Sequence, residues 1–170
     1  MGGLFGVVCK RRCTEDLFYG TDYHSHLGTM RGGMATVDHG EFHRFIHDIT
    51  NSQFRSKFEH DVERLTGAMG IGVISDFDDQ PLLIASHLGT YAIATVGKVA
   101  NADEIMKQAF HRHAAHISNM TLGDISPTEL VATLINQEDT FADGIRRVHA
   151  RLRGSCSLLV LTRDALYAAR

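Results

Sequence analysis

The feature that most constrains the fold is a series of short, continuous apolar runs, most of them in the first hundred residues. Such runs are typical of β-strands covered on both faces, because a half-exposed strand would alternate apolar and polar residues. A terminal hairpin is expected to turn at Arg163-Asp164. The predicted strands are residues 4–8, 34–37, 42–49, 71–75, 82–86, 91–96, 157–161 and 165–168.

Helix signals lie mainly in the second half of the chain. Ser126-Pro127-Thr128-Glu129 combines a capping box with proline at the first helical position, and it predicts a helix from there. Asn101 and Thr140 each precede an acidic first turn and mark two more helix starts. A weaker helix is expected over residues 54–65. Strands, then helices, then strands favour the α+β class, with helices packed on layered sheets.

Composition excludes several classes of protein. A chain of 170 residues fits one domain, 1–170, with a full core. Its net charge of −3 gives no sign of a nucleic-acid partner, and its apolar stretches are too short for a membrane span. Three cysteines suit the reducing cytoplasm better than a disulfide framework, so we expect a cytoplasmic protein.

Eleven histidines raise the question of a metal site. His24 and His26 would share one face of a strand, and His111, His113 and His116 lie on an expected helix. No pair has Cys, Asp or Glu at zinc-motif spacing, so neither a metal nor another cofactor is expected. A His-rich module that binds a metal or a protein stays open as an alternative.

Six strings occur in a particular order and spacing along the chain. They are GLFGVV, HLGTMRGGMATVD, GIGVISDFDDQPLL, YAIATVGKVANADEI, SPTELVATLI and RLRGSCSLLVLTRDALYAAR. Together they resemble the class II glutamine amidotransferases of the N-terminal-nucleophile hydrolase fold, above all the glutaminase domain of amidophosphoribosyltransferases. The resemblance covers essentially the whole chain and implies a single glutaminase-like domain, 1–170, built as a four-layer αββα sandwich.

The resemblance also implies partners. The family continues beyond a strand like residues 166–170 with further sandwich strands and a phosphoribosyltransferase domain. The sandwich is therefore expected to be truncated at its C-terminal side, and a C-terminal phosphoribosyltransferase domain or another protein is an expected partner. Because members of the family form dimers and tetramers, we also expect a homo-oligomer.

The family nucleophile is an N-terminal cysteine, exposed by removal of the initiator methionine, whose own amino group serves as the base. The position that resembles it is Gly2. Glycine has no side chain, so no catalytic residue is expected in this chain. Cys9 and Cys13 are poor substitutes, because the family mechanism needs the thiol and the amine on one residue.

Other positions of the family site are replaced as well. Leu27 stands where the family has an arginine, and Ser75 stands where a second arginine binds the substrate carboxylate. Val96 stands for the asparagine of the oxyanion hole, and Pro127 for the aspartate that receives the substrate amino group. The expected degenerate pocket comprises Leu27, Gly28, Thr29, Ser75, Asp76, Thr95, Val96, Gly97 and Pro127.

These replacements predict a pseudo-glutaminase with a structural, interaction or sensing role. As an alternative, the chain is part of an active amidophosphoribosyltransferase. Its transferase domain would then lie outside this chain and use free ammonia. New chemistry in the altered pocket is a further possibility. Its polar candidates would be His26, Thr29, Ser75, Asp76, Thr95 and Lys98.

Overall fold

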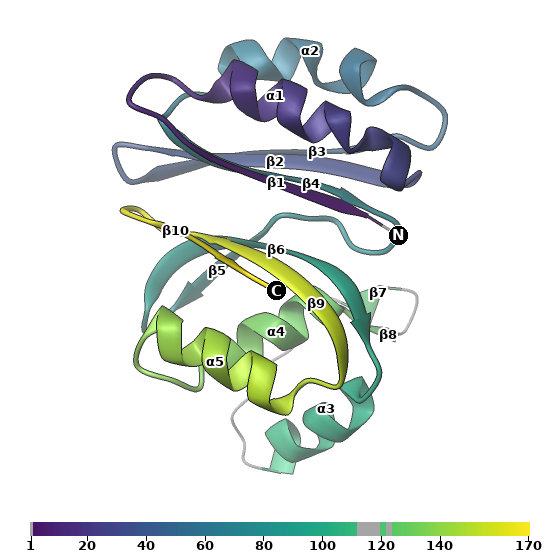
Figure 1. Ribbon diagram of the computed structural model, residues 1–170, viewed down its shortest axis with the longest axis vertical. Helices are drawn as coiled ribbons and strands as arrows, with labels where there is room; N and C mark the ends of the chain where they lie inside the picture. The colour runs from purple at the N-terminus through teal and green to yellow at the C-terminus, as the bar shows by residue number, and fades with distance from the viewer. Residues whose placement is uncertain (1, 112–119, 122–123) are drawn as a thin grey trace.

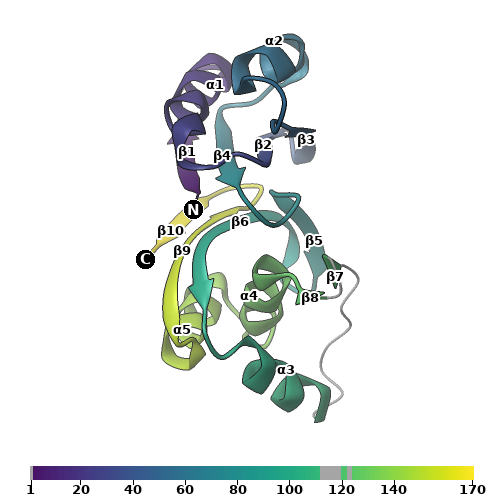
Figure 2. The ribbon, with the colours of Figure 1, turned by 90° about the vertical axis from the view of Figure 1, so that its right-hand side faces the viewer.

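The computed structural model describes residues 2–111, 120–121 and 124–170, which form four stacked layers (Figure 1). Two antiparallel sheets lie face to face in the middle, and helices cover the outer face of each sheet (Figures 1 and 2). This αββα arrangement is the architecture expected from the sequence.

The first sheet has the strand order β1-β4-β2-β3. Its strands are β1 (Gly3–Val8), β4 (Met69–Ser75), β2 (Arg31–Asp38) and β3 (Glu41–Asp48). Every neighbouring pair is antiparallel. Strand β4 is central and almost wholly buried, which agrees with its continuous apolar sequence.

The second sheet has the order β10-β9-β6-β5 and is also antiparallel. Its strands are β10 (Leu166–Ala169), β9 (Gly154–Leu161), β6 (Gly89–Val99) and β5 (Leu82–Ser86). All eight expected strands are thus present, and several extend one to three residues beyond the apolar runs that predicted them.

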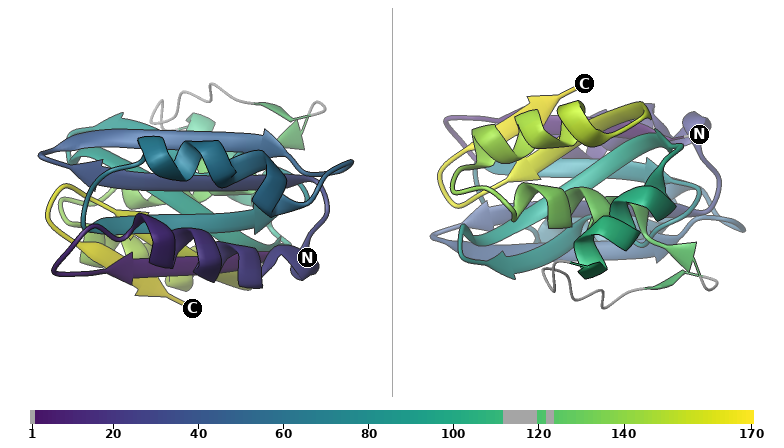
Figure 3. Two further views of the ribbon diagram at one scale, coloured as in Figure 1. Left: turned by 90° about the horizontal axis from the view of Figure 1, so that it is seen from above. Right: turned by 90° about the horizontal axis from the view of Figure 1, so that it is seen from below.

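Three helices cover the second sheet, as seen from below in Figure 3. They are α3 (Ala102–His111), α4 (Pro127–Ile135) and α5 (Phe141–Arg151). The strand pair β7 (Met120–Thr121) and β8 (Asp124–Ile125) lies between α3 and α4 in the chain. All three helices begin where their start signals predict.

Helices α1 (Thr14–Tyr23) and α2 (Phe54–Arg64) cover the first sheet. Helix α2 was expected, but α1 was not, and the prediction that helices follow the strands is wrong there. The α1 sequence contains Gly20 and few strong helix formers, so local propensity does not indicate it. Gly20 packs against Phe5 of β1, where a Cβ would lie 2.3 Å from the ring. Packing on the sheet, rather than propensity, accounts for this helix.

Three buried clusters occupy the three spaces between the layers. The cluster between the sheets uses smaller side chains than the two clusters under the helices. Examples are Phe54 and Phe58, which α2 contributes, Ala35, Val73 and Ala94 between the sheets, and Leu130, Leu134 and Ile135, which α4 contributes. Burial of these surfaces provides the main stabilisation of the sandwich.

The expectation that His24 and His26 share one face of a strand is wrong. His24 follows α1 and His26 lies in the short 3-10 helix η1 (Ser25–Leu27), so they do not share the face of a strand. His111 ends α3, whereas His113 and His116 lie outside the described residues. No helix in the described part of the chain combines the length and apolar character needed to cross a membrane.

Candidate functional site

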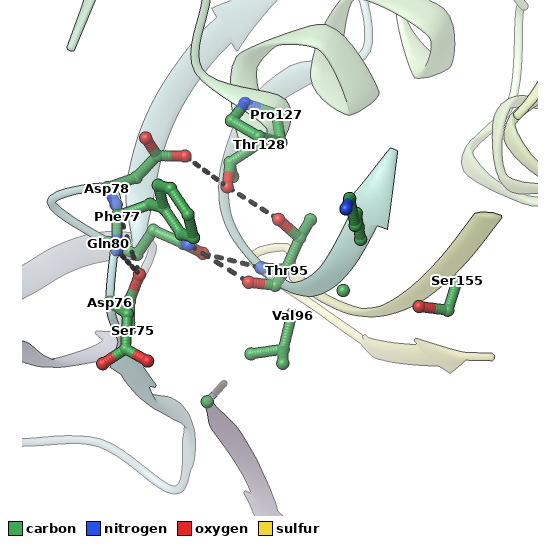
Figure 4. Close-up of a pocket in the computed structure, with 13 residues that line it drawn as sticks. Ser75, Asp76, Phe77, Asp78, Gln80, Thr95, Val96, Pro127, Thr128 and Ser155 are labelled. Carbon is green, nitrogen blue, oxygen red and sulfur yellow. Dashed lines mark hydrogen bonds between the residues drawn. The ribbon is translucent and has the colours of Figure 1, made fainter. Parts of the chain in front are cut away.

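A cavity of about 550 Å³ opens where β4 and β6 meet the start of α4 (Figure 4). We call it the central pocket. Its lining residues come from five separate parts of the chain and are Gly2, Ser75, Asp76, Phe77, Asp78, Gln80, Thr95, Val96, Gly97, Lys98, Pro127, Thr128 and Ser155. Its volume is typical of a site for a small molecule.

Gly2 lines the central pocket, and its position has almost no room for a side chain. A Cβ built on Gly2 would lie 2.3 Å from the carbonyl oxygen of Ile74 and 3.2 Å from Cγ2 of Val96. Contacts shorter than 3.0 Å are essentially never seen for Cβ atoms, so any larger residue requires the backbone to move. Glycine therefore fits this position sterically.

The segment after β4 forms one side of the pocket. The hydroxyl of Ser75 accepts hydrogen bonds from the backbone N–H groups of Phe77 and Asp78, both at 3.2 Å. This local turn is typical of serine, and it turns the chain sharply at the end of the strand. Asp76 accepts a hydrogen bond from the backbone N–H of Thr29 at 2.8 Å. Burial acts to raise the pKa of Asp76, but hydrogen bonds, including the one from Thr29, outweigh it and lower the pKa.

A buried polar network joins this segment to α4 (Figure 4). The Asp78 carboxylate is 2% exposed, and its Oδ2 accepts bonds from Ser126 Oγ at 2.7 Å and Thr128 Oγ1 at 3.2 Å. The Thr128 hydroxyl also lies 2.7 Å from Thr95 Oγ1. Gln80 completes the network, because its side-chain amide accepts from the Thr95 N–H at 2.7 Å and donates to the Thr95 carbonyl at 3.1 Å.

Gly97 permits a close approach of β6 to β9 at the rim of the pocket. Its φ angle is 155°, and a Cβ there would lie 2.0 Å from the carbonyl oxygen of Ser155. A side chain at position 97 would separate the two strands. This residue therefore shapes the pocket through the backbone.

The structure divides the nine residues of the expected pocket. Six of them line the central pocket: Ser75, Asp76, Thr95, Val96, Gly97 and Pro127. Gly28 and Thr29 line a different, more open cavity of about 660 Å³, and Leu27 lines neither. We call this second space the α1–α2 cavity; it is lined by Asp22, Ser25, His26, Gly28, Thr29, Ile49, Thr50, Asn51, Ser52, Gln53, Phe54 and Arg55.

Several lining residues were missed by the sequence analysis. Phe77, Asp78 and Gln80 follow the buried strand β4. The largely polar segment after this strand is the sequence feature that could have indicated them. Thr128 was noted only as part of a helix cap. Ser155 lines the pocket because β9 pairs with β6, and local sequence does not indicate this pairing.

The two cysteines near the N-terminus lie away from the central pocket. Cys9 and Cys13 follow the end of β1, whereas Gly2 precedes its start. Cys13 is fully buried, and burial raises its thiol pKa to about 11, which keeps the thiol protonated at neutral pH. No three His, Cys, Asp or Glu side chains among the described residues are arranged to hold a metal ion.

Comparison with curated proteins identifies one relative across the whole chain. The chain is 26% identical to the amidophosphoribosyltransferase of Methanocaldococcus jannaschii over 182 aligned positions. The match covers all of this chain but only 37% of that protein. No protein-family model matches the chain.

Comparison with solved structures identifies the fold. The glutamine phosphoribosylpyrophosphate (PRPP) amidotransferase from B. subtilis, solved with ADP and GMP, matches with a TM-score of 0.83 and 22% identity. A structure described as the allosteric regulatory enzyme of purine biosynthesis matches with a TM-score of 0.81 and 21% identity. Both matches cover 99% of this chain and 37% of the other.

A class II glutamine aminotransferase domain protein from Silicibacter pomeroyi is more distant, with a TM-score of 0.53 and 17% identity. This match covers 82% of the present chain and 68% of the other. The resemblance expected from the six sequence strings is confirmed by these relatives. The chain therefore has the class II glutamine amidotransferase fold of the N-terminal-nucleophile type, as found in the glutaminase domain of amidophosphoribosyltransferases.

Proposed function

We propose that the chain is a pseudo-glutaminase: a domain with the glutaminase fold that does not hydrolyse glutamine and serves a structural, interaction or ligand-sensing role. The observation that carries this proposal is Gly2 at the nucleophile position. Covalent catalysis requires a nucleophilic side chain to form the acyl intermediate, and glycine supplies none. The surrounding pocket supports the proposal in three further ways.

First, the wall around Gly2 is closed. The carbonyl of Ile74 and the side chain of Val96 occupy the space into which a side chain at position 2 would extend. A cysteine would need both neighbours to move. Val96 also stands where the family resemblance places the asparagine of the oxyanion hole, and its alkyl side chain cannot donate a hydrogen bond.

Second, the groups expected to recognise glutamine are absent from the corresponding positions. Ser75 is too short to bind a carboxylate in a bidentate manner, and its hydroxyl already accepts two backbone bonds of the turn. Pro127 begins α4 and has neither a carboxylate nor a backbone N–H. The pocket therefore has neither of the two charged contacts that the resemblance implies for an α-amino acid.

Third, three of the polar side chains that remain are engaged within the protein. Thr95, Thr128 and Gln80 bind one another or the backbone. Such a network holds the pocket open and stabilises its shape. It is suited to a role in which the cavity is maintained without covalent chemistry.

A second candidate function is favoured by the coverage of the relatives. The chain spans 37% of the length of the amidophosphoribosyltransferases that it matches. It could act beside a phosphoribosyltransferase domain that uses free ammonia, with homo-oligomerisation as in the family. Ammonia-dependent consumption of PRPP by the natural full-length protein would support this candidate.

The test of the main proposal is glutamate release from glutamine, measured on the unmodified chain and on Gly2→Cys. The N-terminal residue of each preparation is first identified by mass spectrometry, because the family mechanism depends on it. We expect no glutamate above background from either protein. We also expect Gly2→Cys to be less stable than the unmodified chain, since its Cβ meets the Ile74 carbonyl.

Gly2→Ser provides a matched control for the steric effect, and the B. subtilis amidotransferase provides a positive control for the assay. The double variant Gly2→Cys/Val96→Asn tests whether the wall alone prevents activity. It should also be inactive, because Ser75 and Pro127 are unchanged. Glutamine turnover by the unmodified chain would overturn the proposal.

A further inference from the structure

We propose that the central pocket binds an organic ammonium ion, meaning a protonated amine on a small apolar body, with the Asp78 carboxylate as its acceptor. This inference rests on the proposed function, because it assigns a ligand class to the same pocket once glutamine is no longer the substrate. Three features of the pocket carry it: a partly satisfied buried carboxylate, a directed hydroxyl network and apolar walls.

Asp78 is the central feature. Its side chain is almost fully buried and lines the pocket, and both of its hydrogen bonds go to Oδ2. No described residue makes a hydrogen bond or ion pair with Oδ1. Oδ1 is not among the enclosed polar atoms that lack a partner, so it is accessible from the pocket. An ionised carboxylate can accept about four hydrogen bonds. A ligand that donates to Oδ1 would supply the missing partner.

The hydroxyl network indicates that Asp78 is an acceptor. The Thr128 hydroxyl donates its one proton to Oδ2 of Asp78. Thr95 must then donate to Thr128, and Ser126 donates to Asp78 from the other side. The hydroxyl protons thus point toward the carboxylate, as expected for a site that holds its negative charge at this place.

The charged residues that line the pocket leave Asp78 as the acceptor for a cation. Asp76 and Asp78 are acidic, and Lys98 is the only basic residue among the described lining residues. Lys98 is exposed, so solvent screens its charge more than that of Asp78. Asp76 is already engaged, because hydrogen bonds and a nearby positive charge lower its pKa. Asp78 is therefore the acidic lining residue with an oxygen left for a ligand.

The remaining walls are suited to an apolar body. Val96 and Pro127 present alkyl surface to the pocket, and Phe77 lines its edge with a side chain that is 74% exposed. An aromatic ring can bind a cation through its face as well as an apolar group through contact. A cavity of about 550 Å³ accommodates a ligand of the size of an aryl- or alkylamine.

The test is a series of matched ligands measured by calorimetry on the whole chain at neutral pH. Benzylamine, benzyl alcohol and benzoate have nearly the same shape but carry a positive, a zero and a negative charge. We expect benzylamine to bind about tenfold or more tightly than benzyl alcohol, and benzoate not to bind. Binding of benzoate at least as tight as that of benzylamine would overturn the proposal, as would the absence of amine binding at millimolar concentration.

Variants locate the site. Asp78→Asn keeps an oxygen that can accept from Ser126 and Thr128, so it preserves the network while removing the charge. It should weaken benzylamine binding about tenfold or more. Asp164→Asn makes the same change on an exposed hairpin turn and should leave binding unaltered. Equal affinities of the two variants would contradict the assignment to Asp78.

Phe77→Ala keeps the proposal testable if Asp78→Asn does not fold, because Phe77 is exposed and its removal should not unfold the chain. It should weaken benzylamine and benzyl alcohol together, while the preference for the amine remains. Unchanged binding of both ligands would remove the pocket as their site. These outcomes are independent of glutamate release, so this inference and the proposed function can fail separately.

Discussion

Helices α1 and α2 lie on the first sheet and α3 to α5 on the second, and the two helical layers are held in different ways. At the N-termini of α4 and α5, Ser126 and Thr140 accept hydrogen bonds from the backbone of the first turn. No described side chain caps the N-terminus of α1 or α2. Helix α1 instead approaches its sheet closely at Gly20 and Gly72. The first layer thus depends on tertiary packing, and the second adds local signals to it.

The largest expected effect is on the close approach of α1 to β4. Gly72→Ala would place a Cβ 1.8 Å from Oγ1 of Thr21, whose hydroxyl also donates to the carbonyl of Leu17. Since Thr21 is stiff and bonded, the helix must move, and we expect a loss of about 2–3 kcal/mol in the free energy of unfolding. The measurement is urea denaturation followed by circular dichroism.

Two variants sharpen this prediction. Gly6→Ala also adds a Cβ between layers, but it meets the flexible ends of Leu166 and Leu159 at 3.0 and 3.4 Å, so it should cost less. Adding Thr21→Ala to Gly72→Ala should recover part of the lost stability, because the clashing hydroxyl is gone. If the free energy of unfolding of Gly72→Ala equals that of the unmodified chain, α1 does not depend on this contact.

The next effect compares two caps in the second layer. Ser126→Ala removes the acceptor for the Glu129 N–H and one of the two donors to Asp78, and should cost about 2 kcal/mol. Thr140→Ala removes an exposed cap and an exposed bond to the Asp143 side chain, and should cost about 1 kcal/mol. Unfolding in urea measures both. Equal losses would mean that the buried bond to Asp78 adds nothing to stability.

A smaller effect concerns the C-terminus of α2, which is capped from a distant part of the chain. The Arg12 guanidinium donates to the carbonyls of Val62, Glu63 and Leu65 at 2.6–3.0 Å. Arg12→Met should cost about 1 kcal/mol and increase amide exchange in the last turn of α2. The neighbouring Arg11 forms an exposed ion pair with Asp16, so Arg11→Met should change stability by less than about 0.5 kcal/mol.

The smallest effect is a gain in stability. Thr36 in β2 is fully buried, and its Oγ1 is the one side-chain polar atom in the described residues that is buried without a hydrogen-bond partner. Thr36→Val removes this hydroxyl at similar volume and should stabilise the chain by about 1 kcal/mol. Thermal unfolding measures the shift. A loss of stability would indicate that packing around the hydroxyl outweighs its missing bond.

The chain sequence by itself determined the order of nearly all elements. Continuous apolar runs predicted the strands, because a strand buried on both faces does not alternate apolar and polar residues. Caps such as Ser126 predicted helix starts, because they satisfy the first backbone N–H groups locally. The expectation that Gly2 stands at the position of the family nucleophile also came from the sequence. These features depend on neighbours in the sequence or on residue type alone.

Only the tertiary structure decided the rest. It placed α1 on the sheet through close contacts with β1 and β4, and it separated Gly28 and Thr29 from the central pocket. It also brought Asp78 against Ser126 and Thr128, which lie about fifty residues away in the chain. Contacts at this separation arise from the packing of layers, so no local pattern predicts which carboxylate is left with an oxygen to offer a ligand.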